Sequence, residues 1–117
     1  MRKKILLVED EKNLCLLYKE ELKEAGYSVT AVLDAESALE SIKKQSFDLI
    51  ITDIRMPGKD GIELITRVMA MRKDVPIIIN TAYQSYKNDF MTWAADAYVV
   101  KSSSMAELKA KIKELIG

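Results

Sequence analysis

The most informative absence in this 117-residue sequence is histidine, which occurs nowhere in the chain. Without an imidazole there is no usual zinc ligand set and no Ser-His or Cys-His pair for nucleophilic catalysis. The only cysteine, Cys15, rules out an internal disulfide, and the leucines around it in a helical pattern predict a buried, inert thiol. The chain also lacks a signal peptide and any apolar run near the roughly 18 residues of a membrane span, so we expect a cytosolic protein.

The chain has no excess of charge of either sign, because 18 basic residues balance 18 acidic ones. No run of like charge exceeds the short Arg2-Lys3-Lys4 start. This balance argues against direct binding of nucleic acid or of a membrane surface, and we expect a protein partner or a small ligand. The length predicts a single domain over residues 1–117, large enough to bury about two-thirds of its unfolded surface.

Five apolar runs alternate with helical patterns along the chain. We expect strands at Ile5–Val8, Ser28–Leu33, Leu49–Ile51, Ile77–Ile79 and Ala97–Val100. The inward-facing helical positions predicted between and after them are Leu14, Leu17, Tyr18, Leu22, Ala25, Ala35, Ala38, Leu39, Ile42, Ile62, Ile65, Val68, Met69, Tyr86, Phe90, Trp93, Ala94, Met105, Leu108, Ile112, Leu115 and Ile116. A strand followed by a helix five times over predicts an α/β fold, with a parallel sheet covered on both faces and right-handed crossovers.

The stretch from Phe47 to Gly61 places a carboxylate, Asp53, directly after the central strand and before a cluster of helix and strand breakers. Open α/β sheets bind their ligands beyond the carboxyl ends of the strands. Taken alone, Asp53 is equally compatible with a role as a loop cap. Four other polar residues also follow or end strands, namely Glu9, Asp10, Thr81 and Lys101, and in a parallel sheet all five converge on one edge.

Three acids, a hydroxyl and a lysine at one edge predict a defined chemistry. Two carboxylates about 4 Å apart repel by roughly 4 kcal/mol at an effective dielectric near 20, so the acids call for a cation. All-oxygen ligands favour Mg²⁺ over Zn²⁺. With Lys101 as a second positive charge and Thr81 as a hydrogen-bond donor, the site suits a phosphoryl group delivered to Asp53 as nucleophile.

The motifs ILLVEDE, DLIITDIRMPGKDG, PIIINTA and AYVVK, each ending a different predicted strand, resemble those of the CheY-like receiver domains of two-component response regulators. The resemblance covers nearly the whole chain. It implies a doubly wound, five-stranded parallel sheet of order 2-1-3-4-5. It also implies a signalling switch rather than an enzyme, with Asp53 phosphorylated by a histidine kinase or a phosphotransfer histidine; the downstream effector stays unknown.

The same resemblance implies roles for individual residues. Asp10, Asp53 and the backbone carbonyl of Arg55 would bind Mg²⁺ or Mn²⁺ directly, and Glu9 would act mainly through water. Lys101 would contact the phosphoryl oxygens, while Thr81 and Tyr98 match the pair that rearranges on phosphorylation.

Two departures from the family pattern and two alternative functions complete the sequence evidence. The segment between Thr81 and Lys101 looks slightly shorter than is typical of the family, and it contains Trp93 where a plain amphipathic helix would be expected. The family usually has proline after the lysine, whereas this chain has Ser102, so we expect a trans Lys101–Ser102 bond. A phosphatase of haloacid-dehalogenase type would usually carry an acid at position 55, where this chain has arginine, and would need a substrate cap. A flavodoxin-like cofactor binder would need a phosphate loop rich in Ser, Thr or Gly after the first strand, where this chain has EDEKN.

Overall fold

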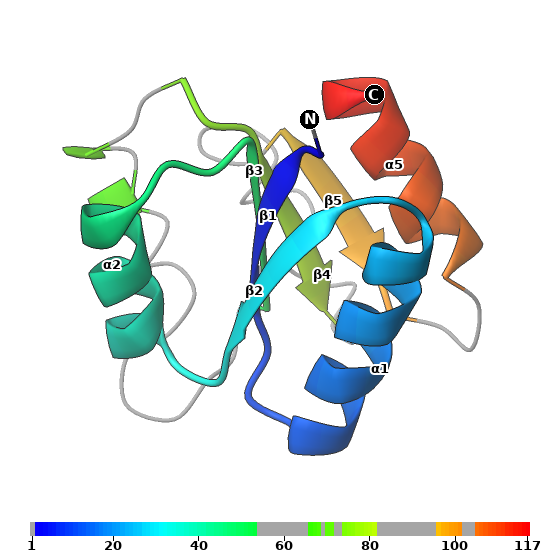
Figure 1. Ribbon diagram of the computed structural model, residues 1–117, viewed down its shortest axis with the longest axis horizontal. Coiled ribbons are helices and arrows are strands. Elements are labelled where there is room, and N and C mark those ends of the chain that lie inside the picture. Colours follow the sequence, from blue (N-terminus) through cyan, green and yellow to red (C-terminus); the bar gives the residue numbers. More distant parts are fainter. Residues whose placement is uncertain (1, 54–65, 69, 72–73, 82–95, 102–104) are drawn as a thin grey trace.

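Five parallel strands form one sheet of order β2-β1-β3-β4-β5 in the computed structural model, as predicted (Figure 1). The structure describes residues 2–53, 66–68, 70–71, 74–81, 96–101 and 105–117. The strands are β1 (Lys4–Val8), β2 (Ser28–Val32), β3 (Leu49–Thr52), β4 (Ile77–Thr81) and β5 (Ala97–Val100). Every described neighbouring pair is parallel, and β1 lies between β2 and β3.

The strands in the middle of the sheet are those with continuous apolar sequences. Every residue of β3 and β4 is buried, and β1 is buried after its first residue. Such runs are typical of parallel strands with helices on both faces. The edge strand β2 has the weaker apolar pattern, and its residues are exposed or half-buried.

Three helices are described in full: α1 (Lys12–Glu24), α2 (Ala35–Lys44) and α5 (Ala106–Ile116). The carboxylate of Glu11 accepts a hydrogen bond from Asn13 N at the start of α1, and Asp34 caps α2 through Ser37 N at 2.7 Å. Gly26 follows α1 with a φ of 102°, the left-handed conformation that ends many helices and that glycine adopts without a Cβ clash.

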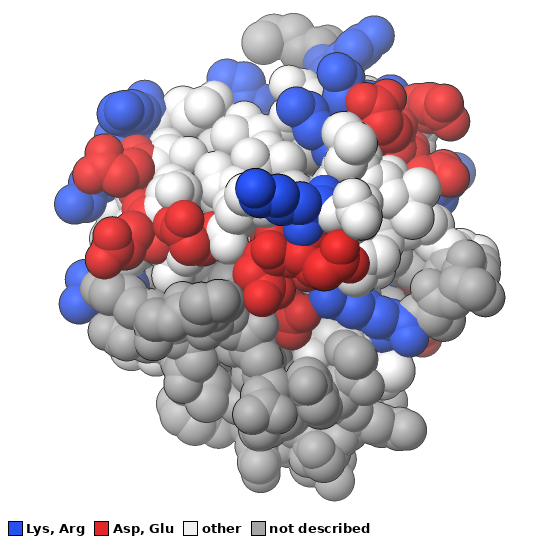
Figure 2. Space-filling model, turned by 90° about the horizontal axis from the view of Figure 1, so that it is seen from below, with Lys and Arg blue, Asp and Glu red and all other residues white. Residues whose placement is uncertain are grey.

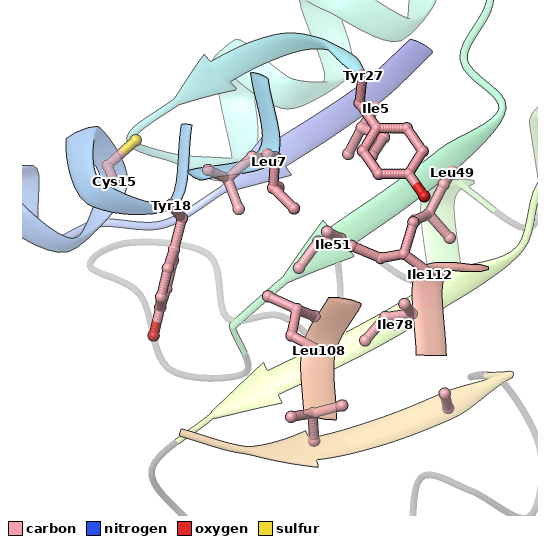
Figure 3. Close-up of a cluster of buried hydrophobic side chains, with 13 residues drawn as sticks. Ile5, Leu7, Cys15, Tyr18, Tyr27, Leu49, Ile51, Ile78, Leu108 and Ile112 are labelled. Atoms are coloured by element: carbon pink, nitrogen blue, oxygen red, sulfur yellow. The ribbon is translucent and has the colours of Figure 1, made fainter. Parts of the chain in front are cut away.

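The sheet separates two hydrophobic clusters (Figure 1). On one face, residues of α2 and Val68 pack in one cluster with side chains of alternate strand positions, including Leu6 and Ile79. On the other face α1 and α5 cover the remaining positions, and Leu108 and Ile112 of α5 pack in the cluster drawn in Figure 3. The predicted fold, a parallel sheet with helices on both faces, is therefore confirmed.

Two predicted inward positions in the first helix are wrong. Leu17 is 50% exposed, and Ala25 is an exposed residue at the end of α1. The buried residues of this helix are Cys15, Tyr18 and Leu22, which have the spacing of a single helical face. Leu17 lies two residues from Cys15, about 200° around the helix, and therefore points away from the sheet.

Several predictions fall partly or wholly outside the described residues. Val68 is helical and buried as expected, while Ile62, Ile65, Met69 and the predicted helix over residues 84–95 lie outside. Ser102, and with it the Lys101–Ser102 bond, also lies outside. The strand predicted to reach Leu33 ends at Val32, and Leu33 is 37% exposed.

Candidate functional site

The carboxyl ends of the strands position the candidate site. Glu9 follows β1, Asp53 follows β3, Lys101 follows β5, and Thr81 is the last residue of β4. Backbone hydrogen bonds extend the sheet to these residues: Glu9 N donates to Val32 O at 3.1 Å, and Lys101 N donates to Thr81 O at 2.7 Å. The polar side chains therefore lie at the point where the backbone hydrogen bonds of the sheet end.

The three acids lie close together. Glu9, Asp10 and Asp53 can each offer a carboxylate oxygen within 4.8 Å of the other two. Glu9 is 2% exposed and Asp53 is 7% exposed, whereas Asp10 lies nearer the solvent. In Figure 2, which looks onto this end of the molecule, acidic side chains gather near the centre of the face with basic side chains beside them.

Lys101 joins two of these acids. Its Nζ lies 2.5 Å from Glu9 Oε1 and donates a hydrogen bond to Asp53 Oδ2 at 2.6 Å. The lysine side chain is only 13% exposed, so water screens these contacts weakly. Among the residues that the structure describes, one ammonium lies beside three carboxylates, so this group carries an excess of negative charge.

Burial and pairing act on the pKa values in opposite ways. Burial raises the pKa of the Glu9 carboxyl, and hydrogen bonds from Lys101 and the Glu11 N–H offset this only in part. Burial alone would lower the pKa of the Lys101 ammonium, but its hydrogen bonds to Asp53 and Glu9 raise that pKa above its ordinary value. Lys101 is therefore fully protonated at neutral pH.

Two supporting contacts were not found from the sequence. Glu11 N donates to Glu9 Oε2 at 3.1 Å, and the Thr52 hydroxyl donates to Asp53 O at 2.9 Å. The first contact forms in the short turn between β1 and α1, and the EDE motif at this turn could have indicated it. The second needs the backbone path beyond β3, which sequence patterns do not specify.

Thr81 and Tyr98 lie on adjacent strands with their side chains on the same face of the sheet. Tyr98 is paired in register with Ile79, and Thr81 is paired with Val100, so the two residues are diagonal neighbours. Thr81 is fully buried, and Tyr98 is 6% exposed in the hydrophobic cluster on the face of the sheet that also carries α2. Arg55, the remaining predicted site residue, lies outside the described part of the chain.

The arrangement can hold a cation. Its donors are all carboxylate oxygens, which suit a hard divalent ion, and partial exposure of Asp10 gives such an ion access from solvent. Within the described residues, no helix is both long and apolar enough to cross a lipid bilayer.

Comparisons with known proteins agree with this geometry. Residues 5–113 match the family described as response regulator receiver domain. The transcriptional regulatory protein RprY of Bacteroides fragilis is 37% identical over 116 residues, which are 97% of this chain and 49% of RprY. The chain thus spans about half the length of such curated relatives.

Solved structures give the same result over nearly whole chains. Response regulator TrrA of Thermotoga maritima, in complex with Mg²⁺-BeF, superposes with a TM-score of 0.92 at 46% identity, covering 97% of this chain and 99% of TrrA. TrrA in complex with the histidine kinase ThkA gives a TM-score of 0.90 at 45% identity, covering 98% and 99%.

Proposed function

Because the chain belongs to the family of response regulator receiver domains, we propose that it is a switch in which Asp53 accepts a phosphoryl group. The observation that carries the proposal is the position of the Asp53 carboxylate. It lies among two other acids, at the edge of the sheet, with the Lys101 ammonium at 2.6 Å. The family match disfavours the phosphatase alternative.

The reaction is a transfer from nitrogen to oxygen. A carboxylate oxygen of Asp53 attacks the phosphorus of a phosphohistidine, the P–N bond breaks, and the imidazole leaves with the bonding electron pair and takes up a proton. Lys101 would contact the phosphoryl oxygens and offset the charge that they bring. Thr81 would donate a hydrogen bond to one of them.

The metal that we propose is Mg²⁺, with Mn²⁺ as a substitute of the same ligand preference. Asp10, Asp53 and the backbone carbonyl of Arg55 would bind it, and Glu9 would act through water. When bound, the ion supplies positive charge that neutralises the phosphoryl oxygens. The Mg²⁺-BeF complex of TrrA supports this assignment.

We place the phosphodonor in a histidine kinase or phosphotransfer protein, since TrrA has been solved bound to the kinase ThkA. The chain would act in the cytoplasm. Its only chemistry would be its own phosphorylation and dephosphorylation. Its output would pass to an effector protein or domain.

The conformational response would run through Thr81 and Tyr98. If the Thr81 hydroxyl moves toward the phosphoryl group, it vacates space on the face that it shares with the Tyr98 ring, which can then change rotamer. We expect beryllofluoride to shift the NMR resonances of Tyr98. Unchanged Tyr98 resonances in a beryllofluoride-saturated protein would contradict the coupling.

The test of the phosphoacceptor is intact mass after incubation with acetyl phosphate and Mg²⁺. The wild-type chain should gain the mass of one phosphoryl group, and Asp53→Asn should gain none. Asp48→Asn is the matched control. Asp48 directly precedes the same strand, β3, but its carboxylate accepts from Lys4 N at the opposite end of the sheet. Phosphorylation of Asp53→Asn would refute the assignment.

A further inference from the structure

Asn80 is a buried polar residue near the carboxyl end of β4. It is 4% exposed, and the three residues before it, Ile77–Ile79, are fully buried. No hydrogen bond joins its carboxamide to another residue in the described part of the chain. Every described side-chain nitrogen or oxygen that is fully shut off from solvent has a partner, so the carboxamide keeps a small contact with solvent. Because a buried amide without an acceptor costs free energy, Asn80 indicates an acceptor that the described residues do not supply.

The alternation of strand side chains places Asn80 on the same face of the sheet as Asp53. Ile78 packs in the cluster of Figure 3, with residues of α1 and α5, while Ile79 packs in the other cluster. Asn80 is therefore on the face of Ile78. By the same alternation, Asp53 is on the face of Ile51, which belongs to the same cluster as Ile78.

The strand register places Asn80 directly beside Asp53. Thr52 pairs with Ile79, and the next pair along these parallel strands is Asp53 with Asn80. The strand path continues to Asp53, since Asp53 N donates to Val8 O at 3.2 Å. Neighbouring strands lie about 4.8 Å apart, and the two side chains have the same number of heavy atoms, so their tips lie level and about one strand spacing apart. This separation is too long for a direct hydrogen bond.

The path of Lys101 also places Asn80 at the site. Lys101 follows β5, whereas its Nζ contacts Asp53 after β3 and Glu9 after β1. Because β4 lies between β5 and β3, the lysine stem crosses the carboxyl end of β4. On that face of the sheet, the nearest described side chain of β4 is that of Asn80.

A phosphoryl group on Asp53 would supply the acceptor. It adds charged oxygens beyond the carboxylate, and a carboxamide offers two N–H donors without adding charge. Hydrogen bonds to charged acceptors are stronger than those between neutral groups. Thr81 has its side chain on the other face of the sheet, so the two donors would approach the phosphoryl group from different sides.

We propose that Asn80 is a further residue of the phosphorylation site, whose carboxamide N–H donates a hydrogen bond to a phosphoryl oxygen on Asp53. The inference rests on the proposed function and adds an uncharged donor to it. Phosphorylation then pairs an amide that the unphosphorylated site leaves without an acceptor among the described residues. Asn80 thereby favours the phosphorylated state over the unphosphorylated one.

The experiment compares the wild-type chain with Asn80→Leu, using beryllofluoride as the phosphoryl mimic in the presence of Mg²⁺ and isothermal titration calorimetry. Leucine has nearly the shape of asparagine but no donor, so the affinity for beryllofluoride should fall at least about tenfold, or about 1.4 kcal/mol. Urea denaturation without beryllofluoride should show a variant at least as stable as wild type, because a buried polar group is gone. The control Asn13→Leu makes the same change at an exposed residue of α1, and its affinity should not change.

NMR gives a readout that does not depend on the folding of a variant. When beryllofluoride and Mg²⁺ saturate the wild-type chain, a side-chain amide proton of Asn80 should shift downfield and exchange more slowly with water. An unchanged amide signal, or equal affinities of wild type and Asn80→Leu, would overturn the role of Asn80 and leave the proposed function intact. Asn80→Leu that is less stable than wild type, together with an unchanged amide signal, would assign Asn80 a purely structural role. Failure of the wild-type chain to bind beryllofluoride would overturn both proposals.

Discussion

The two ends of the sheet both carry acids, but the acids have different partners. At the amino end, Asp48 Oδ2 accepts from Lys4 N at 2.8 Å and Asp96 Oδ2 accepts from Ile77 N at 2.9 Å. Each is an exposed residue that serves one backbone donor. At the carboxyl end the acids are adjacent, and Lys101 bridges two of them.

The partners of a strand-end carboxylate indicate whether it caps a backbone N–H group or belongs to a functional site. A carboxylate with one local backbone N–H ends a strand or a turn, and its charge stays in contact with solvent. The buried carboxylates of Glu9 and Asp53 share one ammonium, and with Asp10 they carry more negative charge than the described residues around them neutralise. Such an excess suits a cation and a reactive phosphoryl group. Position at a strand end does not distinguish the two cases, whereas the kind and number of partners does.

The largest effect that would test this comparison is expected at Lys101. In metal-free buffer, Lys101→Met should lower the free energy of unfolding by about 3 to 5 kcal/mol, since it leaves buried carboxylates without their ammonium. Urea denaturation in EDTA measures the change. Lys101→Arg, which keeps the charge, should recover part of the loss. A loss below about 1 kcal/mol is the usual range of an exposed ion pair, and it would mean that the acids at the carboxyl end of the sheet do not depend on Lys101 more than surface acids depend on their partners.

A smaller effect is expected at the amino end. Asp96→Ala should cost about 1 to 3 kcal/mol, because the buried Ile77 N–H loses its side-chain acceptor. Asp96→Asn retains an amide oxygen and should restore most of the stability. Phosphorylation by acetyl phosphate should be unchanged in both. If Asp96→Asn were as unstable as Asp96→Ala, the charge of Asp96 would matter and the cap interpretation would be wrong.

The smallest effect concerns the pH dependence of Glu9. Because burial raises its pKa above the ordinary 4.5, its contribution to stability is fully present below pH 4.5 and is lost as pH rises through the folded-state pKa. Glu9→Gln stays neutral at every pH. Its stability relative to wild type should therefore increase as metal-free samples are taken from acid to neutral pH. A difference that is constant, or that falls, would contradict the sign of the shift.

Sequence reasoning predicted the sheet well because its strands are short apolar runs bounded by polar residues. It also predicted that Glu9, Asp10, Asp53, Thr81 and Lys101 meet at one edge, since parallel strands bring their carboxyl ends together.

It failed where two patterns overlap or where a side chain is long. In the run from Leu14 to Leu17 every position is apolar, so the pattern does not set the phase of the helix, and Leu17 was placed on the wrong face. The bridge from Lys101 to Glu9 and Asp53 depends on the torsions of a flexible stem, which no residue pattern encodes. The functional roles of these residues stay predictions.

The place of β1 between β2 and β3 has a consequence for synthesis on the ribosome. Its first residue pairs with the segment before β3 through Lys4 and Asp48, which are 44 positions apart. At roughly 5 to 20 residues per second, the most apolar early segment of the chain waits about 2 to 9 seconds for that partner. During this interval only β2, an edge strand of weaker apolar character, can pair with it. The nascent chain therefore presents an incomplete sheet with an open edge, the kind of surface that chaperones bind.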